Sequence, residues 1–303
     1  MHQPISIIVP VFNEQDGVTD TVRGIHGVLS AAVLPFEIII VDDGSNDNTA
    51  QALRALRDAA RVVRHPNNRG YGAALKTGIA VAAYDHIVII DADGTYPSDR
   101  IPELAGAMAG HDMVVAARSG AGVHIPFARR PAKWFITKLA EYLCGQPIPD
   151  LNSGLRIMRK DVLMRFIGLL PDGFSFTTTI TLAMISNGCR VHYVPINYNA
   201  RQGRSKIRPI SDTLNFIQLI IRTVMYFEPL KVFLPLSLLL FIGAMAALIH
   251  RVIVGRGLLV ISVMLFVAAI QILAVGMLAD LFDKRSQIKY SPFEDEIHKD
   301  ATR

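Results

Sequence analysis

The stretch His86-Ile87-Val88-Ile89-Ile90-Asp91-Ala92-Asp93 decides how this chain is interpreted, because a short apolar run ends there in two carboxylates. Such a run is typical of a strand that is buried on both faces. Two carboxylates just past a strand can hold a divalent cation, since hard cations such as Mg²⁺ prefer oxygen ligands. Open α/β sheets also bind their ligands at the carboxyl ends of strands. Taken alone, the pair fits a loop cap or a turn equally well.

Apolar runs and helical stretches alternate on both sides of this segment. Strands are predicted at residues 5–9, 36–41, 61–64, 86–90 and 112–116, and helices at 17–32, 48–59, 72–83 and 99–109. Continuous apolar strands that alternate with helices predict an α/β fold, in which helices cover both faces of a mostly parallel central sheet.

The regular alternation ends near residue 121, and two amphipathic segments follow. Residues 127–144 form a predicted basic helix, which fits either the membrane interface or ordinary packing on the sheet. Residues 210–227 form a second amphipathic stretch. For this one the interfacial position is favoured, because the chain must enter a bilayer at Lys231.

Two long apolar runs near the C-terminus predict a membrane hairpin. Residues 232–249 and 257–279 carry no charged side chain, and both are apolar around the whole circumference. As helices they would span about 27 Å and about 35 Å, against a hydrocarbon core of about 30 Å. Two buried helices of a globular core are the weaker alternative.

The distribution of basic residues predicts the orientation of this hairpin. Basic residues flank it on both outer sides, whereas the connecting loop carries only Arg251 and Arg256. This bias predicts that the N-terminal domain and both termini are cytoplasmic, in an integral membrane protein of the inner or plasma membrane if the source is bacterial. The flanking residues are Lys206, Arg208, Arg222 and Lys231 before the hairpin, and Lys284, Arg285 and Lys289 after it.

Composition adds two further limits. Of the 303 residues 51% are hydrophobic and the pI is near 9.3, which suits a domain that lies against anionic lipid or grips phosphates. Cys144 and Cys189 are far apart in sequence and have no metal-ligand spacing, so a reduced compartment fits and neither is expected to be catalytic.

Polar residues also follow the first two predicted strands. Asn13 and Glu14 come just after the first, and Asp42 and Asp43 come at the end of the second. The two aspartates are expected to accept hydrogen bonds from a base or a ribose, whereas Asp47 fits the cap of the next helix.

A turn-rich loop at residues 67–72 opens the third predicted helix, and its glycines suit the close approach of a ligand to the backbone. No Gly-x-Gly-x-x-Gly follows the first strand, which argues against a Rossmann oxidoreductase.

Taken in order, four segments resemble the inverting glycosyltransferases of family 2, which have the GT-A fold. They are VPVFNE at 9–14, VDDGSNDNT at 41–49, NRGYGAALKTG at 68–78 and DADGTYP at 91–97. With DLNSGLR at 150–156, RQGRSKI at 201–207 and the hairpin, the chain is more similar to the polyprenyl-phosphate glycosyltransferases, such as dolichyl-phosphate mannose synthase and bacterial undecaprenyl-phosphate relatives. The resemblance covers roughly residues 4 to 209.

The resemblance implies roles on the donor side of the site. The residues expected to bind the donor are Pro10, Asn13, Glu14, Asp42, Asp43, Lys76, Asp91 and Ala92. Asp91 and Asp93 would hold Mg²⁺ or Mn²⁺ against the donor diphosphate. Thr95 stands where the family often has Gln, and its hydroxyl can ligate the metal or hold a metal-bound water.

The resemblance also implies catalytic and acceptor residues. Arg201 and Lys206 fall where the family's loop closes on the donor phosphates, so the catalytic set is Asp93, Asp150, Arg201 and Lys206. Asp150 is a candidate general base, an organiser of Arg156, or a plain turn residue. The residues expected near the acceptor phosphate are Arg118, Arg129, Arg130, Ser153 and Arg156. The segment 174–179 departs from the family, since it has hydroxyls where many relatives have an acid.

These motifs predict a metal-dependent enzyme that moves one sugar from a nucleotide donor to polyprenyl phosphate. UDP and undecaprenyl phosphate are favoured, and a nucleic-acid partner is not expected. A processive polysaccharide synthase is an alternative, but the Gln-x-x-Arg-Trp motif typical of those enzymes is missing around the single Trp134. A catalytically silent membrane scaffold with the same fold is the alternative from another class.

The predicted organisation has four parts. They are a GT-A domain at 1–209, a juxtamembrane helix at 210–230, two transmembrane helices at 231–282 and a cytoplasmic tail at 283–303. Small residues in the first span, such as Gly243 and Ala247, would allow a homo-oligomer to form through the membrane helices.

Overall fold

A computed structural model of the protein describes residues 3–118, 137–142, 144–197, 218, 220–222, 225, 226, 228–255 and 258–288. The chain divides into two compact units, Met1–Leu219 and Ile220–Arg303.

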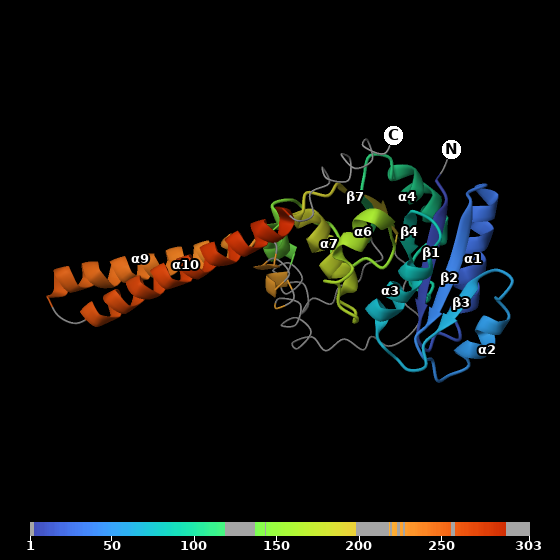
Figure 1. The fold of residues 1–303 in the computed structure, drawn as a ribbon, viewed down its shortest axis with the longest axis horizontal. Coiled ribbons are helices and arrows are strands. Elements are labelled where there is room, and N and C mark those ends of the chain that lie inside the picture. The colour runs from blue at the N-terminus through green and yellow to red at the C-terminus, as the bar shows by residue number, and fades with distance from the viewer. Residues whose placement is uncertain are drawn as a thin grey trace. The chain divides into compact units, whose positions relative to one another are not determined.

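The first unit holds a seven-stranded sheet of order β3-β2-β1-β4-β6-β5-β7 (Figure 1). The pairs β1–β2, β1–β4, β2–β3 and β5–β7 are parallel, whereas β6 runs antiparallel to β4 and β5. The predicted mostly parallel sheet is therefore confirmed. Its strands are β1 (Ile5–Val11), β2 (Phe36–Asp42), β3 (Arg61–Arg64), β4 (His86–Ile89), β5 (Met113–Arg118), β6 (Arg156–Arg159) and β7 (Val191–Ile196).

Helices cover both faces of this sheet. Alternate residues of β1, such as Ile7 and Val9, share one buried cluster with Val22 of α1 and Leu104 of α4. Ile8 points to the opposite face, where Gly78 of α3 lies against it. The helices are α1 (Val18–Ala31), α2 (Thr49–Arg54), α3 (Tyr71–Val81), α4 (Ile101–Ala107) after the 3-10 turn η1 (Ser98–Arg100), α6 (Lys160–Phe166) and α7 (Phe176–Ser186). The four predicted helices correspond to α1, α2, α3 and η1–α4, although α2 ends earlier than expected.

The antiparallel strand β6 explains how the site is assembled. The parallel strands β1, β2 and β4 end at one edge of the sheet, and β5 ends there too. Because β6 runs the other way, it begins at this edge, where Arg156 pairs with Ile89 of β4 and Val115 of β5. The residues just before β6 therefore meet those just after β4.

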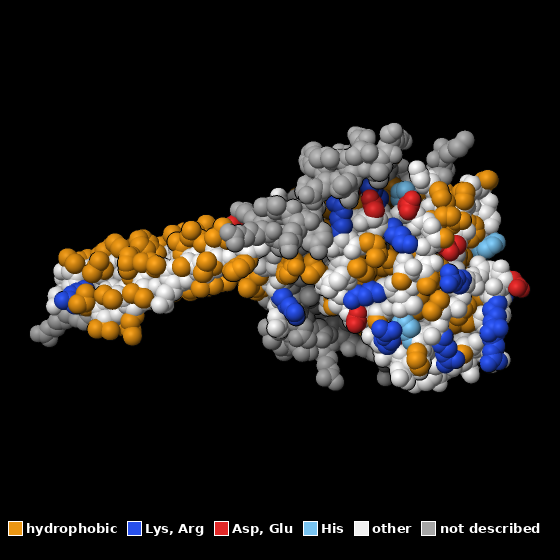
Figure 2. Space-filling model, viewed as in Figure 1, with side chains coloured by type: hydrophobic (Ala, Val, Ile, Leu, Met, Phe, Trp, Pro, Cys, Tyr) orange, Lys and Arg blue, Asp and Glu red, His pale blue; other side chains and the backbone are white. Residues whose placement is uncertain are grey.

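The second unit holds the hairpin of α9 (Leu230–Val254) and α10 (Leu259–Ile288). Both helices are long and apolar enough to cross a membrane, over Leu230–Val254 and Leu259–Phe282. Only 11% and 17% of their apolar windows are buried, so they are not core helices, and hydrophobic side chains cover their surface (Figure 2). The two expected spans are thus present as helices.

The two hairpin helices pack on each other through small residues. Ser237 of α9 donates a hydrogen bond of 2.9 Å to the carbonyl of Ala269 in α10. Gly276 lies so close to Phe233 that an added Cβ would stand 2.5 Å from the Phe233 Cβ. Of the two predicted amphipathic segments, residues 137–142 and 144 are helical, as are 218, 220–222, 225 and 226; the remaining positions lie outside the described residues.

Candidate active site

The site is built around Asp91, which follows β4 at the carboxyl edge of the sheet. Its Oδ1 accepts a hydrogen bond of 2.8 Å from the hydroxyl of Tyr71 at the start of α3. Its Oδ2 faces Gly154, where an added Cβ would stand only 2.1 Å away. The Asp91 carboxylate is therefore held between a phenol and a glycine.

Asp93 completes the carboxylate pair, and Thr95 supports it. The Oδ1 of Asp93 accepts hydrogen bonds from the hydroxyl of Thr95 at 2.6 Å and from its backbone N–H at 3.2 Å. Thr95 itself is buried. Its hydroxyl proton is thus directed at Asp93, which orients the second carboxylate of the predicted metal pair.

The electrostatics of this pair suit a cation. Burial raises the pKa of Asp91 to about 6, against the opposing effect of the Tyr71 hydrogen bond, and the nearby Asp93 carboxylate contributes to the rise. A divalent cation would relieve both the desolvation and the like-charge repulsion. Among the described residues no cluster of three or more His, Cys, Asp or Glu could hold a metal. The two carboxylates Asp91 and Asp93 fit a hard cation such as Mg²⁺, which often takes its other ligands from water and phosphate oxygens.

The loop before β6 closes over Asp91. The backbone N–H of Gly154 donates a hydrogen bond of 2.6 Å to the hydroxyl of Tyr96, which is itself buried. The start of α1 supports the same place from the other side, since Thr21 donates to the carbonyl of Ala92 at 3.0 Å. The DLNSGLR and DADGTYP motifs are thus brought together in space.

Asp150 and Arg118 form a two-pronged ion pair at this edge. Arg118 donates to Asp150 through Nε at 2.7 Å, through Nη2 at 2.8 Å and through its backbone N–H at 3.0 Å. Burial by itself raises the pKa of Asp150, but the hydrogen bonds and charge of Arg118 outweigh it and hold that pKa below its usual range. Asp150 is therefore an ionised, firmly paired carboxylate, which suits an organising role better than that of a general base.

Arg156 is completely buried at the start of β6. Its guanidinium donates to the carbonyls of Ser153 and Thr177 and to the hydroxyl of Thr181. In the described part of the chain it forms no ion pair with a carboxylate. Burial lowers its pKa. Ser153 is equally buried, so a direct contact of either residue with an acceptor phosphate would require the loop to rearrange.

On the donor side, Asp43 is occupied by the chain itself. Its carboxylate accepts hydrogen bonds from the backbone N–H groups of Arg69 and Gly70 at 2.9 and 2.8 Å, and contacts His65 Nδ1 at 2.6 Å. His65 in turn lies 2.9 Å from the hydroxyl of Thr77. Asp43 therefore holds the loop that leads to α3.

Asp42 has fewer hydrogen-bond partners than Asp43. Its Oδ1 accepts the N–H of Ser45 at 2.9 Å, whereas its fully buried Oδ2 lies 3.2 Å from Arg64 Nε and accepts no hydrogen bond among the described residues. Asn13 has a positive φ of 57°, and its Oδ1 accepts the N–H of Asn46 at 2.9 Å. The Asn13–Asn46 hydrogen bond thus ties together the loops after β1 and β2.

Three other residues predicted to bind the donor make contacts within the chain. Pro10 is buried near the end of β1, opposite Val41 of β2. The backbone N–H of Glu14 donates to Thr49 Oγ1 at 3.0 Å. Lys76 makes an ion pair of 2.7 Å with Asp172. Four predicted residues lie outside the described ones: Arg129, Arg130, Arg201 and Lys206.

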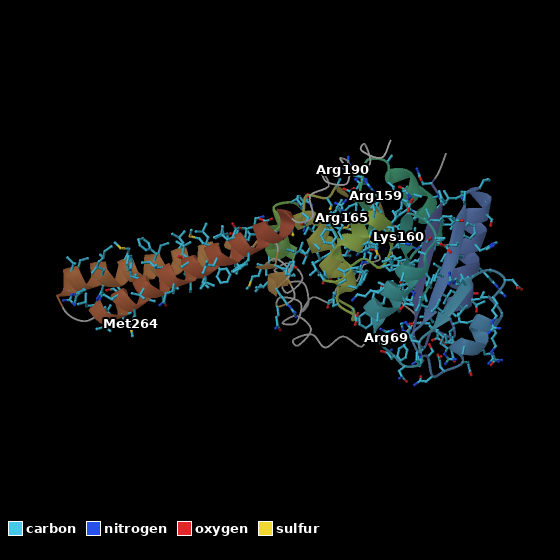
Figure 3. The ribbon with its side chains drawn as sticks, in the orientation of Figure 1. Arg69, Arg159, Lys160, Arg165, Arg190 and Met264 are labelled. Atoms are coloured by element: carbon cyan, nitrogen blue, oxygen red, sulfur yellow. The ribbon has the colours of Figure 1, made fainter. Side chains whose placement is uncertain are left out.

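Arg159, the last residue of β6, lies away from the site. Arg159 pairs with His86 at the start of β4, so it stands at the opposite edge of the sheet from Asp91. Figure 3 shows Arg159 and Arg190 at one end of the first unit and Arg69, in the loop before α3, at the other. Arg159 also forms an ion pair with Asp161. The charge of Arg159 is therefore paired with a neighbouring surface carboxylate.

The prediction from sequence missed Tyr71, Tyr96 and Gly154 as parts of the site. Each lies inside a motif that the sequence singles out, but a motif alone does not say which side chain meets Asp91. The hydroxyl-rich segment at the start of α7 is buried, and the Oγ1 atoms of Thr178 and Thr179 have no hydrogen-bond partner among the described residues.

Comparison with known families decides the class of this site. The model of glycosyl transferase family 2 matches residues 6–166. The chain belongs to glycosyl transferase family 2. A second model, the GtrB C-terminal hairpin, matches residues 228–282, which hold α9 and most of α10. The predicted family and the place of its hairpin are confirmed.

The names of the curated relatives are those of undecaprenyl-phosphate sugar transferases. The chain is similar to undecaprenyl-phosphate 4-deoxy-4-formamido-L-arabinose transferase of Pseudomonas fluorescens SBW25, with 32% identity over 189 residues, 58% of this chain and 55% of the relative. The enzyme of the same name from Edwardsiella ictaluri is 31% identical over 190 residues, 58% of either chain. The chain thus spans little more than half the length of these relatives.

Solved structures confirm the GT-A-like fold. Glucosyl-3-phosphoglycerate synthase from Mycobacterium tuberculosis, solved with Mn²⁺, UDP-glucose and phosphoglyceric acid, aligns with a TM-score of 0.57 and 20% identity over 73% of this chain and 80% of that one. The same enzyme with Mg²⁺ and UDP aligns with a TM-score of 0.56 and 20% identity, over 73% and 79%. At this identity the likeness supports the fold alone.

Proposed function

We propose that this protein is a membrane-bound, inverting transferase that moves one sugar from a nucleotide-sugar to polyprenyl phosphate, with UDP and undecaprenyl phosphate the favoured substrates. The observation that carries the proposal is the Asp91–Asp93 pair, which lies at the carboxyl edge of the sheet in a chain whose C-terminal region matches the GtrB hairpin. The names of the curated relatives support a lipid-phosphate acceptor.

On the donor side, Asp91 and Asp93 would hold Mg²⁺ or Mn²⁺, with Thr95 orienting Asp93. A bound divalent cation would supply positive charge where the diphosphate leaving group becomes more negative. Asp42, whose Oδ2 makes an ion pair with Arg64 but accepts no hydrogen bond among the described residues, would take a hydrogen bond from the nucleoside. Asp43 would keep the neighbouring loop in place rather than touch the ligand.

On the acceptor side, a phosphate oxygen of the lipid would attack the anomeric carbon while the bond from that carbon to the diphosphate oxygen breaks. The lipid phosphate is already anionic near neutral pH, so it needs orientation more than deprotonation. The ion pair of Asp150 with Arg118 supports this division, because a paired carboxylate with a lowered pKa is a poor proton acceptor. Arg118 would then face the acceptor phosphate, and Arg129, Arg130, Arg201 and Lys206 would add charge from outside the described residues.

A donor screen tests the proposal. Purified protein in detergent, with Mn²⁺ and undecaprenyl phosphate, would be mixed with UDP- and GDP-sugars, and the lipid product would be identified by mass. The expected result is a single glycosyl-phosphoryl-polyprenol that is absent with Asp93→Ala. Folded protein that forms no product with any donor would favour the silent-scaffold alternative.

A further inference from the structure

The short segment Pro171–Phe174, just before α7, is fastened to the start of α3. The backbone N–H of Ala73 donates to the carbonyl of Asp172 at 3.1 Å. A Cβ on Gly72 would stand 2.1 Å from the carbonyl oxygen of Pro171, so only glycine permits this approach. The glycines in this loop are thus used for the close approach of the chain's own backbone.

Gly70 contributes to the same fastening in a second way. Its φ of 103° is a conformation that other residues rarely adopt, and an added Cβ would stand 2.4 Å from the carbonyl oxygen of Asp172. The side chain of Asp172 adds an ion pair with Lys76. Backbone contact, shape and charge therefore hold the segment on the first two turns of α3.

The fastened segment presents one aromatic ring to another. Phe174 stacks on Tyr71 with ring centroids 5.5 Å apart and an angle of 14° between the rings. Phe174 is otherwise 84% exposed, so this stack is its principal packing contact. A stack of this kind restricts the ring it covers. The segment thus packs against the ring whose hydroxyl points at Asp91.

Tyr71 is the one described residue that donates a hydrogen bond to Asp91. Gly154 lies on the other side of that carboxylate, where its lack of a side chain leaves room for Asp91 Oδ2. The rotation of the Asp91 carboxylate therefore depends on Tyr71. Groups that hydrogen-bond a metal ligand typically change metal affinity by about 10- to 100-fold when they are removed.

We propose that Tyr71 is a positioning residue for the metal ligand Asp91, and that the segment Pro171–Phe174 holds Tyr71 in place. The inference rests on the proposed function, since it assumes that Asp91 binds the cation. By this proposal, part of the affinity of the site for its metal comes from Tyr71 and Phe174, which are not metal ligands themselves.

The test compares Tyr71→Phe with Tyr142→Phe in the full-length protein. The first variant keeps the stacked ring and removes the hydroxyl, whereas Tyr142 is 59% exposed and serves as the matched control. Mn²⁺ affinity in the presence of UDP would be measured by electron paramagnetic resonance of the free ion. UDP affinity in EDTA and the unfolding temperature would be measured on the same samples.

The expected result for Tyr71→Phe is an Mn²⁺ Kd that rises by about 10-fold or more, with the metal-free UDP affinity unchanged. Phe174→Ala should shift the Kd in the same direction by a smaller factor. Tyr142→Phe should match the wild type.

Two other results would overturn the inference, and they are distinguishable. A wild type that binds Mn²⁺ together with a Tyr71→Phe variant of equal affinity would refute the role of Tyr71 alone. A folded wild type that binds no Mn²⁺ with UDP or GDP would refute the metal site of the proposed function, and the inference with it.

Discussion

Asp43 and Asp91 are both carboxylates at the carboxyl edge of the same sheet, yet their surroundings differ. Asp43, at the end of β2, accepts two backbone hydrogen bonds and contacts His65, so both of its oxygens are used by the chain. Asp91, after β4, accepts one described hydrogen bond, from Tyr71, and faces the bare backbone of Gly154.

The difference separates a carboxylate that supports its own loop from one whose surroundings suit a ligand. A buried carboxylate with all its hydrogen bonds made stabilises its loop and has little left to offer a ligand. One that is buried with few partners is unfavourable by itself and becomes favourable when a cation arrives. By this comparison the loop after β2 is preformed, whereas the proposed cation would complete the place after β4.

The largest effect is expected at the metal pair. Asp93→Ala should lower transferase activity by about 10³-fold or more, because charge on the leaving group would lose its stabilisation. Product formation would be followed by mass, and the unfolding temperature should stay near that of the wild type. Activity within tenfold of the wild type would show that Asp93 does not hold the metal.

The space beside Asp91 should matter almost as much. Gly154→Ala would place a Cβ 2.1 Å from Asp91 Oδ2 and displace that carboxylate, so activity should fall by about 10²-fold. The matched control is Gly168→Ala, where an added Cβ meets nothing within 4 Å. Equal activities of these two variants would show that the space beside Asp91 at Gly154 is not needed for activity.

The opposite outcome is expected for Asp43, whose removal should affect folding first. Asp43→Ala would leave His65 and the N–H groups of Arg69 and Gly70 without their partner, at a cost of about 1–3 kcal/mol in the free energy of unfolding. Denaturant titration would measure it. Asp47→Ala is the comparison variant, since it removes a half-buried carboxylate that accepts one backbone hydrogen bond, from the N–H of Thr49. The comparison of carboxylates fails if Asp43→Ala is as stable as Asp47→Ala.

The smallest expected effect is a dependence of stability on pH. The pKa of Asp91 is about 6 in the folded protein against 3.8 for an ordinary aspartate, so the folded state binds this proton more tightly. Metal-free stability should therefore fall as pH rises from about 4 to about 6 and level off above that range. The unfolding temperature in EDTA would be measured for the wild type and Asp91→Asn. If the difference in unfolding temperature between the two proteins does not vary with pH, the raised pKa of Asp91 is wrong.

Much of the first half of the fold is predictable from the sequence, because periodicity and turn signals are local. The run from His86 to Ile90 predicts β4, and the loop at Asp42–Asp43 marks the end of β2. The strand β6 is different. Its short sequence, Arg156–Arg159, has charged ends and no turn pattern that would reveal its reversed direction.

The site, too, is only partly predictable from the sequence. The carboxylates at Asp91 and Asp93 stand out in the sequence because two charges end a buried run. The contacts of Tyr71 with Asp91 and with Phe174 join residues 20 and about 100 positions apart, and only the packed fold makes them visible. The roles of Asp42 and Asp43 are likewise separable only from their hydrogen bonds, since in the sequence the two are neighbours of one type.

The most direct test of the metal site is a crystal of the protein with Mn²⁺ and UDP, measured at the manganese absorption edge. The account predicts one strong anomalous peak within bonding distance of the Asp91 and Asp93 carboxylates and of a diphosphate oxygen. A peak elsewhere, with UDP bound and these carboxylates bare, would contradict it.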